Sequence, residues 1–250
     1  MEALIKRILD FVISFALLIL TMPIILIFSL LIFLQDYSNP LYTPQRVGRN
    51  ERPFTMIKLR SMIINADKSG VDSTANNDSR ITVVGALVRR FKLDELMQLV
   101  NVVKGDMSLV GPRPNVKRET DLYTSKETKL LSVRPGITDL ASIVFSDEGK
   151  ILENQDDPDI AYNQLIRPGK GYLGLFYIDN RSFLMDMRII LLTGIAIFNM
   201  PLALAGVVKI LKKLNAPEEL IAISMRDKPL VAMPPPGATK IVTNREGAAE

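Results

Sequence analysis

The sequence contains neither cysteine nor histidine among its 250 residues. The absence of thiols and imidazoles excludes a disulfide framework, a cysteine nucleophile, a serine-histidine-aspartate triad and a zinc site built from histidine or cysteine. Any catalysis must therefore use carboxylates, lysine, arginine, hydroxyl groups or an oxygen-ligated metal ion. Apolar residues, by contrast, are abundant: they make up 48% of the chain, and its mean hydropathy is +0.19. This composition favours a membrane-associated protein.

Charges of the two signs are nearly balanced, with 31 lysine and arginine residues against 27 aspartate and glutamate residues. The small positive excess is spread along the chain, so it indicates an anionic surface or anionic substrates rather than a dedicated nucleic-acid binder. The sequence has no Gly-x-Gly-x-x-Gly fingerprint and no Walker A motif, so neither dinucleotide binding nor P-loop phosphate binding is indicated. We expect no nucleic-acid partner.

The longest apolar segment is an uncharged run of 24 residues, 11–34. A helix of this length would extend roughly 36 Å, enough to cross a hydrocarbon core of roughly 30 Å. A cleaved signal peptide is disfavoured, because the run is longer than a usual signal core and has no small-residue cleavage pattern after it. The sequence therefore predicts a membrane segment near the N-terminus.

Pro23 lies near the middle of this run, where it removes a backbone donor and should kink the helix. Two geometries remain open: a kinked helix that spans the bilayer, and a re-entrant helix that returns to the face from which it entered. Basic residues flank both ends of the run, among them Lys6 and Arg7 before it and Arg46 and Arg49 after it. Because basic flanks favour the cytoplasmic side, re-entry would satisfy this preference at both ends.

The remainder of the chain is predicted to be mainly helical with a minor β element. Residues 54–62 have strand-like content, and apolar residues recur at helical spacing over 81–103, where Gly105 would close the helix. A second uncharged run, 189–208, could span the membrane, lie on its surface or pack on the domain. From residue 215 onward, scattered proline, alanine and glycine predict a disordered tail.

Two adjacent acids, Asp94 and Glu95, lie in basic and apolar surroundings. Neighbouring helical positions point about 100° apart, so the two carboxyl groups are not expected to share a proton, but they can divide roles. One could attack a phosphorus atom while the other binds a divalent cation. Taken alone, such a pair is more often a solvated helix face, and Arg113 in a Gly-Pro-Arg-Pro segment is more often part of a turn that joins two helices.

The sequence around these residues favours the chemical interpretation. Residues 92–114 read KLDELMQLVNVVKGDMSLVGPRP, and this run resembles the signature of the bacterial sugar transferases, the monotopic phosphoglycosyl transferases that start bacterial glycan assembly. The resemblance extends to KRILD at 6–10, RVG at 46–48, residues 54–62 and RPGIT at 134–138. It covers roughly residues 4–141 well and the remainder loosely.

The resemblance implies an activity and residue roles. Members of this family move a sugar 1-phosphate from a UDP-sugar to polyprenyl (undecaprenyl) phosphate and release UMP, by a ping-pong route through a phosphosugar-aspartyl enzyme. By position in the motif, Asp94 would be the nucleophile and Glu95 a ligand of the cofactor Mg²⁺. The basic residues at motif positions would contact phosphate or donor: Lys58, Arg89, Arg113 and Arg134.

The resemblance also implies an architecture and a location. The family's membrane helix is re-entrant and breaks at a proline, which matches Pro23 and favours re-entry here. The expected organisation is a re-entrant helix over 1–36, a cytoplasmic catalytic domain over 37–188, a membrane-associated helix over 189–214 and a disordered tail over 215–250. The expected site is the cytoplasmic face of the bacterial inner membrane, in lipopolysaccharide or exopolysaccharide synthesis.

The partners implied are a UDP-sugar, polyprenyl phosphate and membrane lipid, with a homodimer left open. A rival from another class is a non-catalytic, membrane-anchored module that recruits glycosyltransferases. The presence of Asp94 and Glu95 among basic phosphate contacts argues against that rival. A polytopic polyisoprenyl transferase is disfavoured because the sequence has at most two apolar runs long enough to span.

The chain departs from the family pattern at three places. Met22 stands before Pro23 where the family often has serine, and Lys92 stands where a serine would cap the turn before Asp94. After Ile137 and Thr138, residues 139–146 read DLASIVFS in place of a Gly-Trp-Ala-Gln element that precedes Asn-Gly-Arg. The arginine of that element has no clear match. These changes leave the reaction type intact and put the sugar preference in doubt.

Overall fold

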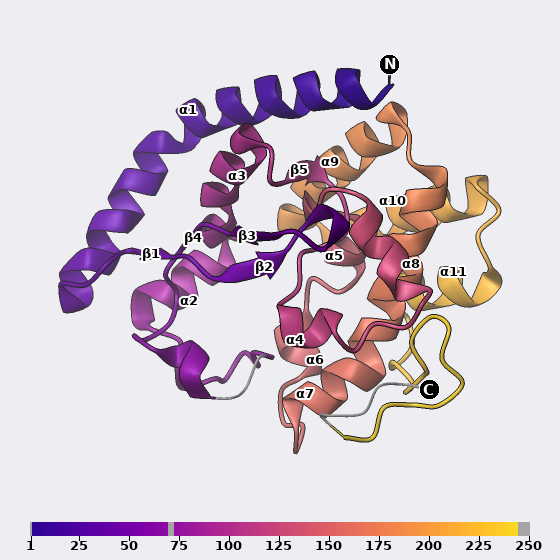
Figure 1. Cartoon of the computed structure of the whole chain (residues 1–250). Coiled ribbons are helices and arrows are strands. Elements are labelled where there is room, and N and C mark those ends of the chain that lie inside the picture. The colour runs from indigo at the N-terminus through magenta and orange to yellow at the C-terminus, as the bar shows by residue number, and fades with distance from the viewer. Residues whose placement is uncertain (1, 70–72, 245–250) are drawn as a thin grey trace.

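The structure, a computed structural model, describes residues 2–69 and 73–244 (Figure 1). It is mainly helical with a minor β component, as the sequence predicts. The helices are α1 (Glu2–Asp36), α2 (Val83–Arg90), α3 (Gln98–Lys104), α4 (Lys117–Thr120), α5 (Leu140–Val144), α6 (Glu148–Ile151), α7 (Pro158–Ala161), α8 (Arg167–Asn180), α9 (Phe183–Phe198), α10 (Met200–Lys213) and α11 (Glu218–Met225). The strands are β1 (Leu41–Tyr42), β2 (Gln45–Val47), β3 (Pro53–Thr55), β4 (Lys58–Leu59), β5 (Ser108–Val110) and β6 (Gly136–Thr138).

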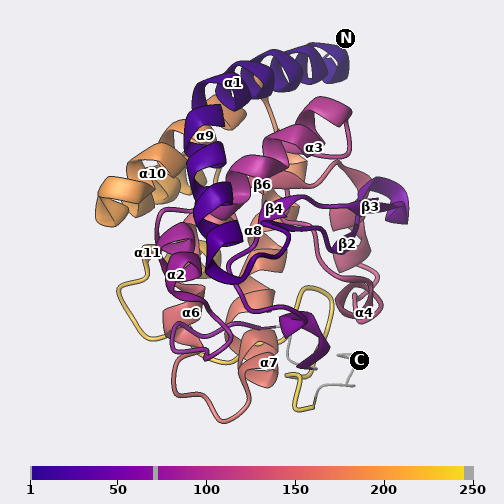
Figure 2. The ribbon, with the colours of Figure 1, turned by 90° about the vertical axis from the view of Figure 1, so that its left-hand side faces the viewer.

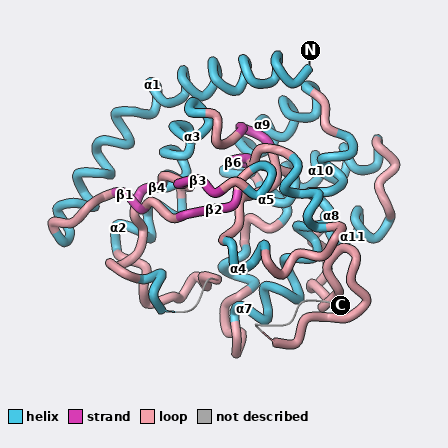
Figure 3. Tube along the Cα trace, in the orientation of Figure 1, coloured by secondary structure: helices cyan, strands magenta, loops and turns pink. Residues whose placement is uncertain are grey.

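The strands form short two-stranded pairs at the centre of the molecule, with helices around them (Figure 3). Strands β1 and β4 pair antiparallel, as do β2 and β3, whereas β5 and β6 pair parallel. The parallel pair continues into two turns: the Gly111 amide donates to the Thr138 carbonyl, and the Gly136 amide donates to the Pro112 carbonyl, each at 3.0 Å. A Cβ atom at Gly136 would lie 2.1 Å from the Gly111 nitrogen. Glycine is therefore required where the two turns touch.

The main hydrophobic core joins the C-terminal helices to the β5–β6 pair. Leu140 and Ile143 of α5 face Leu173 of α8, Ile189 of α9 and Leu211 of α10, and all five side chains are buried. A second, smaller cluster joins Ile25 and Ile32 of α1 to Leu59 and Val88. Burial of this apolar surface is the main force that assembles the domain.

Helix α1 bends as it runs over the domain, as Figures 1 and 2 show from two directions. Pro23 lies inside this helix, where proline is the usual cause of a sharp bend. The Thr21 hydroxyl donates to the Leu17 carbonyl at 2.7 Å, a contact that also favours bending. Among the described residues, α1 is the one helix long and apolar enough to cross a membrane. Much of its surface is exposed, with Leu20 at 74%.

Both ends of α1 are bound to the same domain. Near its N-terminus, Lys6 Nζ lies 2.5 Å from an Asp186 carboxylate oxygen, and the Ser108 hydroxyl donates to the buried Asp10 at 2.8 Å. At its C-terminus, Asp36 accepts hydrogen bonds from Arg60 at 2.5 and 2.6 Å. The two ends of the helix therefore contact one and the same domain.

The second uncharged run does not form one helix. It is divided between α9 and α10 because Asn199 ends the first helix and caps the second, its side-chain oxygen accepting from the Leu202 amide at 3.1 Å. Neither helix meets the criterion for a membrane span within the described residues. The single helix predicted for 189–214 is therefore replaced by a helical hairpin.

The predicted disordered tail contains a helix and contacts with the domain. Helix α11 lies within it, with Leu220 and Ile221 buried against the core. Beyond the helix, the Gln164 side-chain amide donates to the Val242 carbonyl at 2.7 Å. The sequence-based prediction of disorder rested on the prolines of this segment and gave too little weight to its apolar residues. Residues 245–250 lie outside the described part of the chain.

Candidate active site

The two acids of the motif lie in a break between helices. The sequence predicts one helix over 81–103, but the chain turns at Lys92, which has a left-handed φ of 56°. Residues Leu93–Met97 then form a 3-10 turn before α3 begins at Gln98. The predicted C-cap at Gly105 is confirmed, with a φ of 100°. The break places Asp94 and Glu95 in a short turn that faces a cleft, rather than on the side of a long helix.

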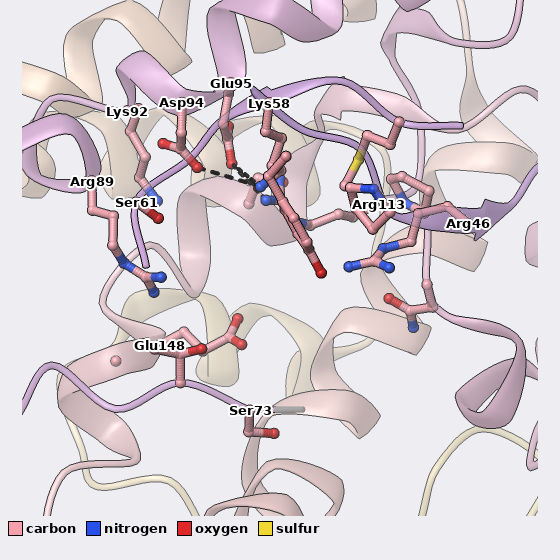
Figure 4. A pocket seen from close by; sticks show the side chains of 18 of the residues that line it. Arg46, Lys58, Ser61, Ser73, Arg89, Lys92, Asp94, Glu95, Arg113 and Glu148 are labelled. Carbon is pink, nitrogen blue, oxygen red and sulfur yellow. Dashed lines mark hydrogen bonds and ion pairs between the residues drawn. The ribbon is translucent and has the colours of Figure 1, made fainter. Parts of the chain in front are cut away.

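The cleft has a volume of about 1560 Å³. Its walls come from β4, α2, the Leu93–Met97 turn, the Gly-Pro-Arg-Pro turn and the N-terminal parts of α6 and α8. Figure 4 shows Arg89 and Lys92 on one side of the acid pair and Arg46 and Arg113 on the other. Cations on both sides make the cleft suited to an anionic ligand that is long enough to reach from one side to the other.

Lys58 contacts both acids. Its Nζ atom lies 3.4 Å from Asp94 Oδ2 and 3.9 Å from Glu95 Oε1 (Figure 4). Arg113 Nη2 lies 2.5 Å from the same Glu95 oxygen. Two cations therefore share one carboxylate, while Asp94 keeps a single, longer contact with lysine. Asp94 is the acid whose oxygen atoms are less engaged by protein cations.

The protonation states follow from this geometry. Burial alone would raise the pKa of Glu95, but the charges of Arg113 and Lys58 outweigh it and lower the pKa to about 2. The Glu95 carboxylate in turn raises the pKa of Arg113. Burial lowers the pKa of Lys58, and the Asp94 charge opposes that shift. Glu95 is therefore ionised throughout the physiological range and holds Arg113 in place by charge.

Most of the predicted site residues meet in this cleft, and two do not. Lys58, Arg89 and Arg113 line it together with Asp94 and Glu95. Arg134 is not among the lining residues described by the structure; its Nε donates to the Gly105 carbonyl at 2.8 Å, which ties two turns of the scaffold together. Pro23 lies in α1, away from the cleft.

Other cleft residues were not predicted as site residues. The sequence indicates Arg46 only as part of a motif, and it gives no signal for Glu148, Lys170 or Tyr162, which also line the cleft. Glu148 and Lys170 form an ion pair across 22 residues of sequence, and no local pattern signals such a contact. Only the fold brings α6 and α8 to the same wall.

A magnesium ion at this site would take its protein ligand from Glu95. Mg²⁺ is commonly held by one or two protein carboxylates, with substrate phosphates and water completing its octahedron. Both ion pairs of Glu95 use Oε1, so Oε2 is the oxygen that would ligate the ion. The described residues contain no group of three or more His, Cys, Asp or Glu that could hold a metal. The donor set therefore fits an ion that binds together with a phosphate ligand.

Comparison with known proteins identifies relatives of the chain. The family model for bacterial sugar transferase matches residues 1–200. A Bacillus subtilis protein provisionally named as an undecaprenyl-phosphate N-acetylgalactosaminyl 1-phosphate transferase is 45% identical over 122 residues, which cover 49% of this chain and 66% of the relative. The uncharacterized sugar transferase EpsL of the same organism is 35% identical over 191 residues, covering 76% of this chain and 85% of the relative.

A third relative is the UDP-glucose:undecaprenyl-phosphate glucose-1-phosphate transferase of Caulobacter vibrioides. It is 38% identical over 141 residues, which cover 55% of this chain and 53% of the relative. The chain thus spans about half of this protein and most of EpsL. The names of the first and third relatives specify different sugars. The match to the family model, over residues 1–200, includes the turn that bears the two acids.

Proposed function

The chain belongs to the bacterial sugar transferase family, and we propose that it transfers a sugar 1-phosphate from a UDP-sugar to polyprenyl phosphate with release of UMP. The observation that carries this proposal is the position of Asp94, an acid in contact with Lys58 inside a cleft lined by arginine and lysine. Such a cleft attracts a diphosphate, and the Asp94 carboxylate lies beside the cations that would hold its phosphoryl oxygens. The reaction would initiate assembly of a bacterial surface glycan.

In the first proposed step, an Asp94 oxygen attacks the β-phosphorus of the UDP-sugar. The bond between that phosphorus and the bridging oxygen breaks, and UMP leaves with the electron pair. Lys58, 3.4 Å from Asp94, is placed to neutralise charge that develops on the phosphoryl oxygens. The product is a mixed anhydride between Asp94 and the sugar phosphate, as nucleophilic catalysis by a carboxylate requires.

In the second proposed step, a phosphate oxygen of the lipid acceptor attacks the same phosphorus and releases Asp94. The acceptor must reach the cleft from the membrane surface. Helix α1 supports such a route, since its exposed surface is apolar and its C-terminal end is joined to β4 through the nearby Arg60. Mg²⁺, when bound at Glu95 with the diphosphate, would offset its negative charge.

A direct assay tests this function. Purified protein in detergent, with Mg²⁺ and undecaprenyl phosphate, is expected to release UMP from at least one of UDP-glucose, UDP-galactose, UDP-N-acetylglucosamine and UDP-N-acetylgalactosamine. Release is expected to be at least about 100-fold above the same reaction without enzyme, a small fraction of the usual enzymatic acceleration. Absence of UMP with every donor would reject the proposal.

Arg113 is expected to contribute directly to donor recognition. It lies between Pro112 and Pro114, and its guanidinium is held by Glu95, so it is aimed before the ligand arrives. Arg113→Lys keeps the charge but removes the planar pair of donors that phosphate can engage. We expect kcat/KM for UMP release to fall by about one to two orders of magnitude, equivalent to about 1.4 to 2.8 kcal/mol, with an unchanged melting temperature. Activity within about two-fold of the parent would leave Gly-Pro-Arg-Pro as a structural turn.

We further propose that α1 is re-entrant and that the domain lies on the cytoplasmic face of the inner membrane. The contacts of Lys6 and Asp36 with one domain support this topology, as do the basic residues at both ends of the helix. Helix α1 curves over the domain (Figure 1), and many of its apolar side chains are exposed. The interior of the bilayer is the environment in which these side chains would be stable.

Cysteine labelling tests the topology, because the chain contains no cysteine. Leu4→Cys places a single exposed thiol in the first turns of α1, and Arg52→Cys places one beyond the C-terminal end of the helix. In intact spheroplasts, we expect an impermeant maleimide to label neither variant, and in permeabilised cells to label both. A helix that spans the bilayer would instead make one of the two thiols reactive in intact spheroplasts.

A further inference from the structure

One carboxylate in the cleft has no part in the proposed phosphoryl transfer. Glu148 begins α6, and Figure 4 shows it on the wall opposite Asp94 and Glu95. Its carboxylate pairs with Lys170 of α8, whose Nζ lies 5.1 Å from the centre of the Tyr162 ring. All three residues line the cleft. On this wall, Glu148 and Lys170 supply the charged groups, and the Tyr162 ring lies next to Lys170.

A carboxylate at this position is unsuited to binding phosphate. Burial would raise the pKa of Glu148, but Lys170 and then the more distant Arg113 and Lys92 lower it, so the group is an anion within electrostatic reach of the cations that would hold the diphosphate. It would repel a phosphate placed beside it. The ligand groups that suit a carboxylate next to an ammonium are neutral hydroxyl and amide groups, which can donate to one and accept from the other.

The wall is firmly supported by the C-terminal part of the chain. Arg226, at the end of α11, donates to the Val144 carbonyl and to Asp147, each at 2.9 Å. Its guanidinium also lies 5.6 Å from the centre of the Phe145 ring. These contacts hold the residues that immediately precede Glu148. The family model ends at residue 200, so this support comes from outside the matched region.

The segment that leads to this wall begins at a capped helix. Asp139 caps α5, accepting from the Ser142 amide at 2.6 Å. Helix α5 then leads to Phe145 and Glu148. The named relatives use UDP-glucose or transfer N-acetylgalactosamine 1-phosphate, so the part of the donor that differs among them is the sugar.

We propose that Glu148 and Lys170 form the subsite that recognises the hydroxyl or acetamido groups of the donor's sugar. This inference rests on the proposed function. Glu148 accepts a hydrogen bond from a sugar hydroxyl or amide, and Lys170 donates to a sugar oxygen. The Tyr162 ring holds the lysine in position through its contact with the ammonium group. Once the phosphorus lies at Asp94, a sugar directed away from the acid pair would meet this opposite wall.

The test compares Glu148→Gln with the parent on the four UDP-sugars named above. For the donor that the parent uses best, we expect kcat/KM to fall by about 10- to 100-fold, because a built hydrogen-bonding site discriminates strongly when one group is changed. The preference between that donor and its C4 epimer should narrow. Inhibition by UMP, which lacks the sugar, should stay within about two-fold. Equal weakening of UMP inhibition would place Glu148 at the nucleotide and overturn the proposal.

Two further variants guard against a folding artefact. Lys170→Gln removes the positive charge of the pair, whereas Glu148→Gln removes the negative one. Both variants should narrow the preference between the two sugars in the same way. Asp179→Asn removes an ion pair with Lys129 whose side chains are about half exposed and lie outside the cleft lining, so it should behave as the parent. Parent-like sugar preference in both wall variants would reject the subsite. Absence of UMP release by the parent itself would instead reject the proposed function.

Discussion

Asp94→Asn is expected to reduce the release of UMP from the best donor by about three orders of magnitude or more. The neutral amide has nearly the shape of the carboxylate, but it cannot serve as an anionic nucleophile toward phosphorus. The loss should be present with and without polyprenyl phosphate, since the first step needs only donor and enzyme. UMP release is measured over a single turnover and at steady state.

The same experiment needs a matched replacement elsewhere. Asp121→Asn removes a carboxylate that pairs with Lys117 on an exposed helix, and it should leave UMP release within about two-fold of the parent. The melting temperature of Asp94→Asn should show that the fold is intact. Near-parent turnover by a folded Asp94→Asn protein would remove this residue from the chemistry.

Glu95→Gln should reduce kcat/KM for UMP release by about two orders of magnitude and raise the Mg²⁺ concentration required for half-maximal rate by about ten-fold. Two effects combine in this variant. A carboxylate ligand is replaced by a weaker neutral one, and Arg113 loses the anion that holds it at 2.5 Å. Titration of the rate with MgCl₂ separates them, because only the first effect changes the dependence on the ion.

Glu218→Gln is a suitable control, since Glu218 is exposed on α11 and does not line the cleft. It should leave both the rate and the Mg²⁺ dependence unchanged. If Glu95→Gln lowers the rate without altering the Mg²⁺ dependence, Glu95 acts only by positioning Arg113. The assignment of Glu95 as a metal ligand would then be wrong.

The parts of the fold that depend on local sequence signals could be predicted. The length of the apolar run and Pro23 predict a bent membrane helix, and Gly105 predicts the end of α3. The sequence does not show where tertiary contacts override a local pattern. Lys92 has no local preference for the left-handed φ that breaks the helix before Asp94. Likewise, Asn199 divides an apolar run because the two resulting helices pack on each other and on the core.

The candidate site divides in the same way. Contiguous motif residues predict Asp94, Glu95 and Arg113, and the parallel pairing of β5 with β6 positions the Gly-Pro-Arg-Pro turn beside them. Arg134 begins the separate segment RPGIT and points to the Gly105 carbonyl, because residues on the two neighbouring turns need not face the same side. Glu148 and Lys170 belong to no recognisable motif, and only the tertiary fold brings them within ion-pair distance.

Trapping the covalent enzyme tests the central claim most directly. The protein is incubated with its best UDP-sugar and Mg²⁺ in the absence of polyprenyl phosphate, quenched in acid and analysed by mass spectrometry of the intact chain and its peptides. We expect a mass increase equal to one sugar phosphate, located on the peptide that contains Asp94 and absent from Asp94→Asn. Adding polyprenyl phosphate before the quench should remove it. UMP release that occurs only with acceptor present, with no adduct under any condition, would contradict the two-step mechanism and indicate direct transfer between the two substrates.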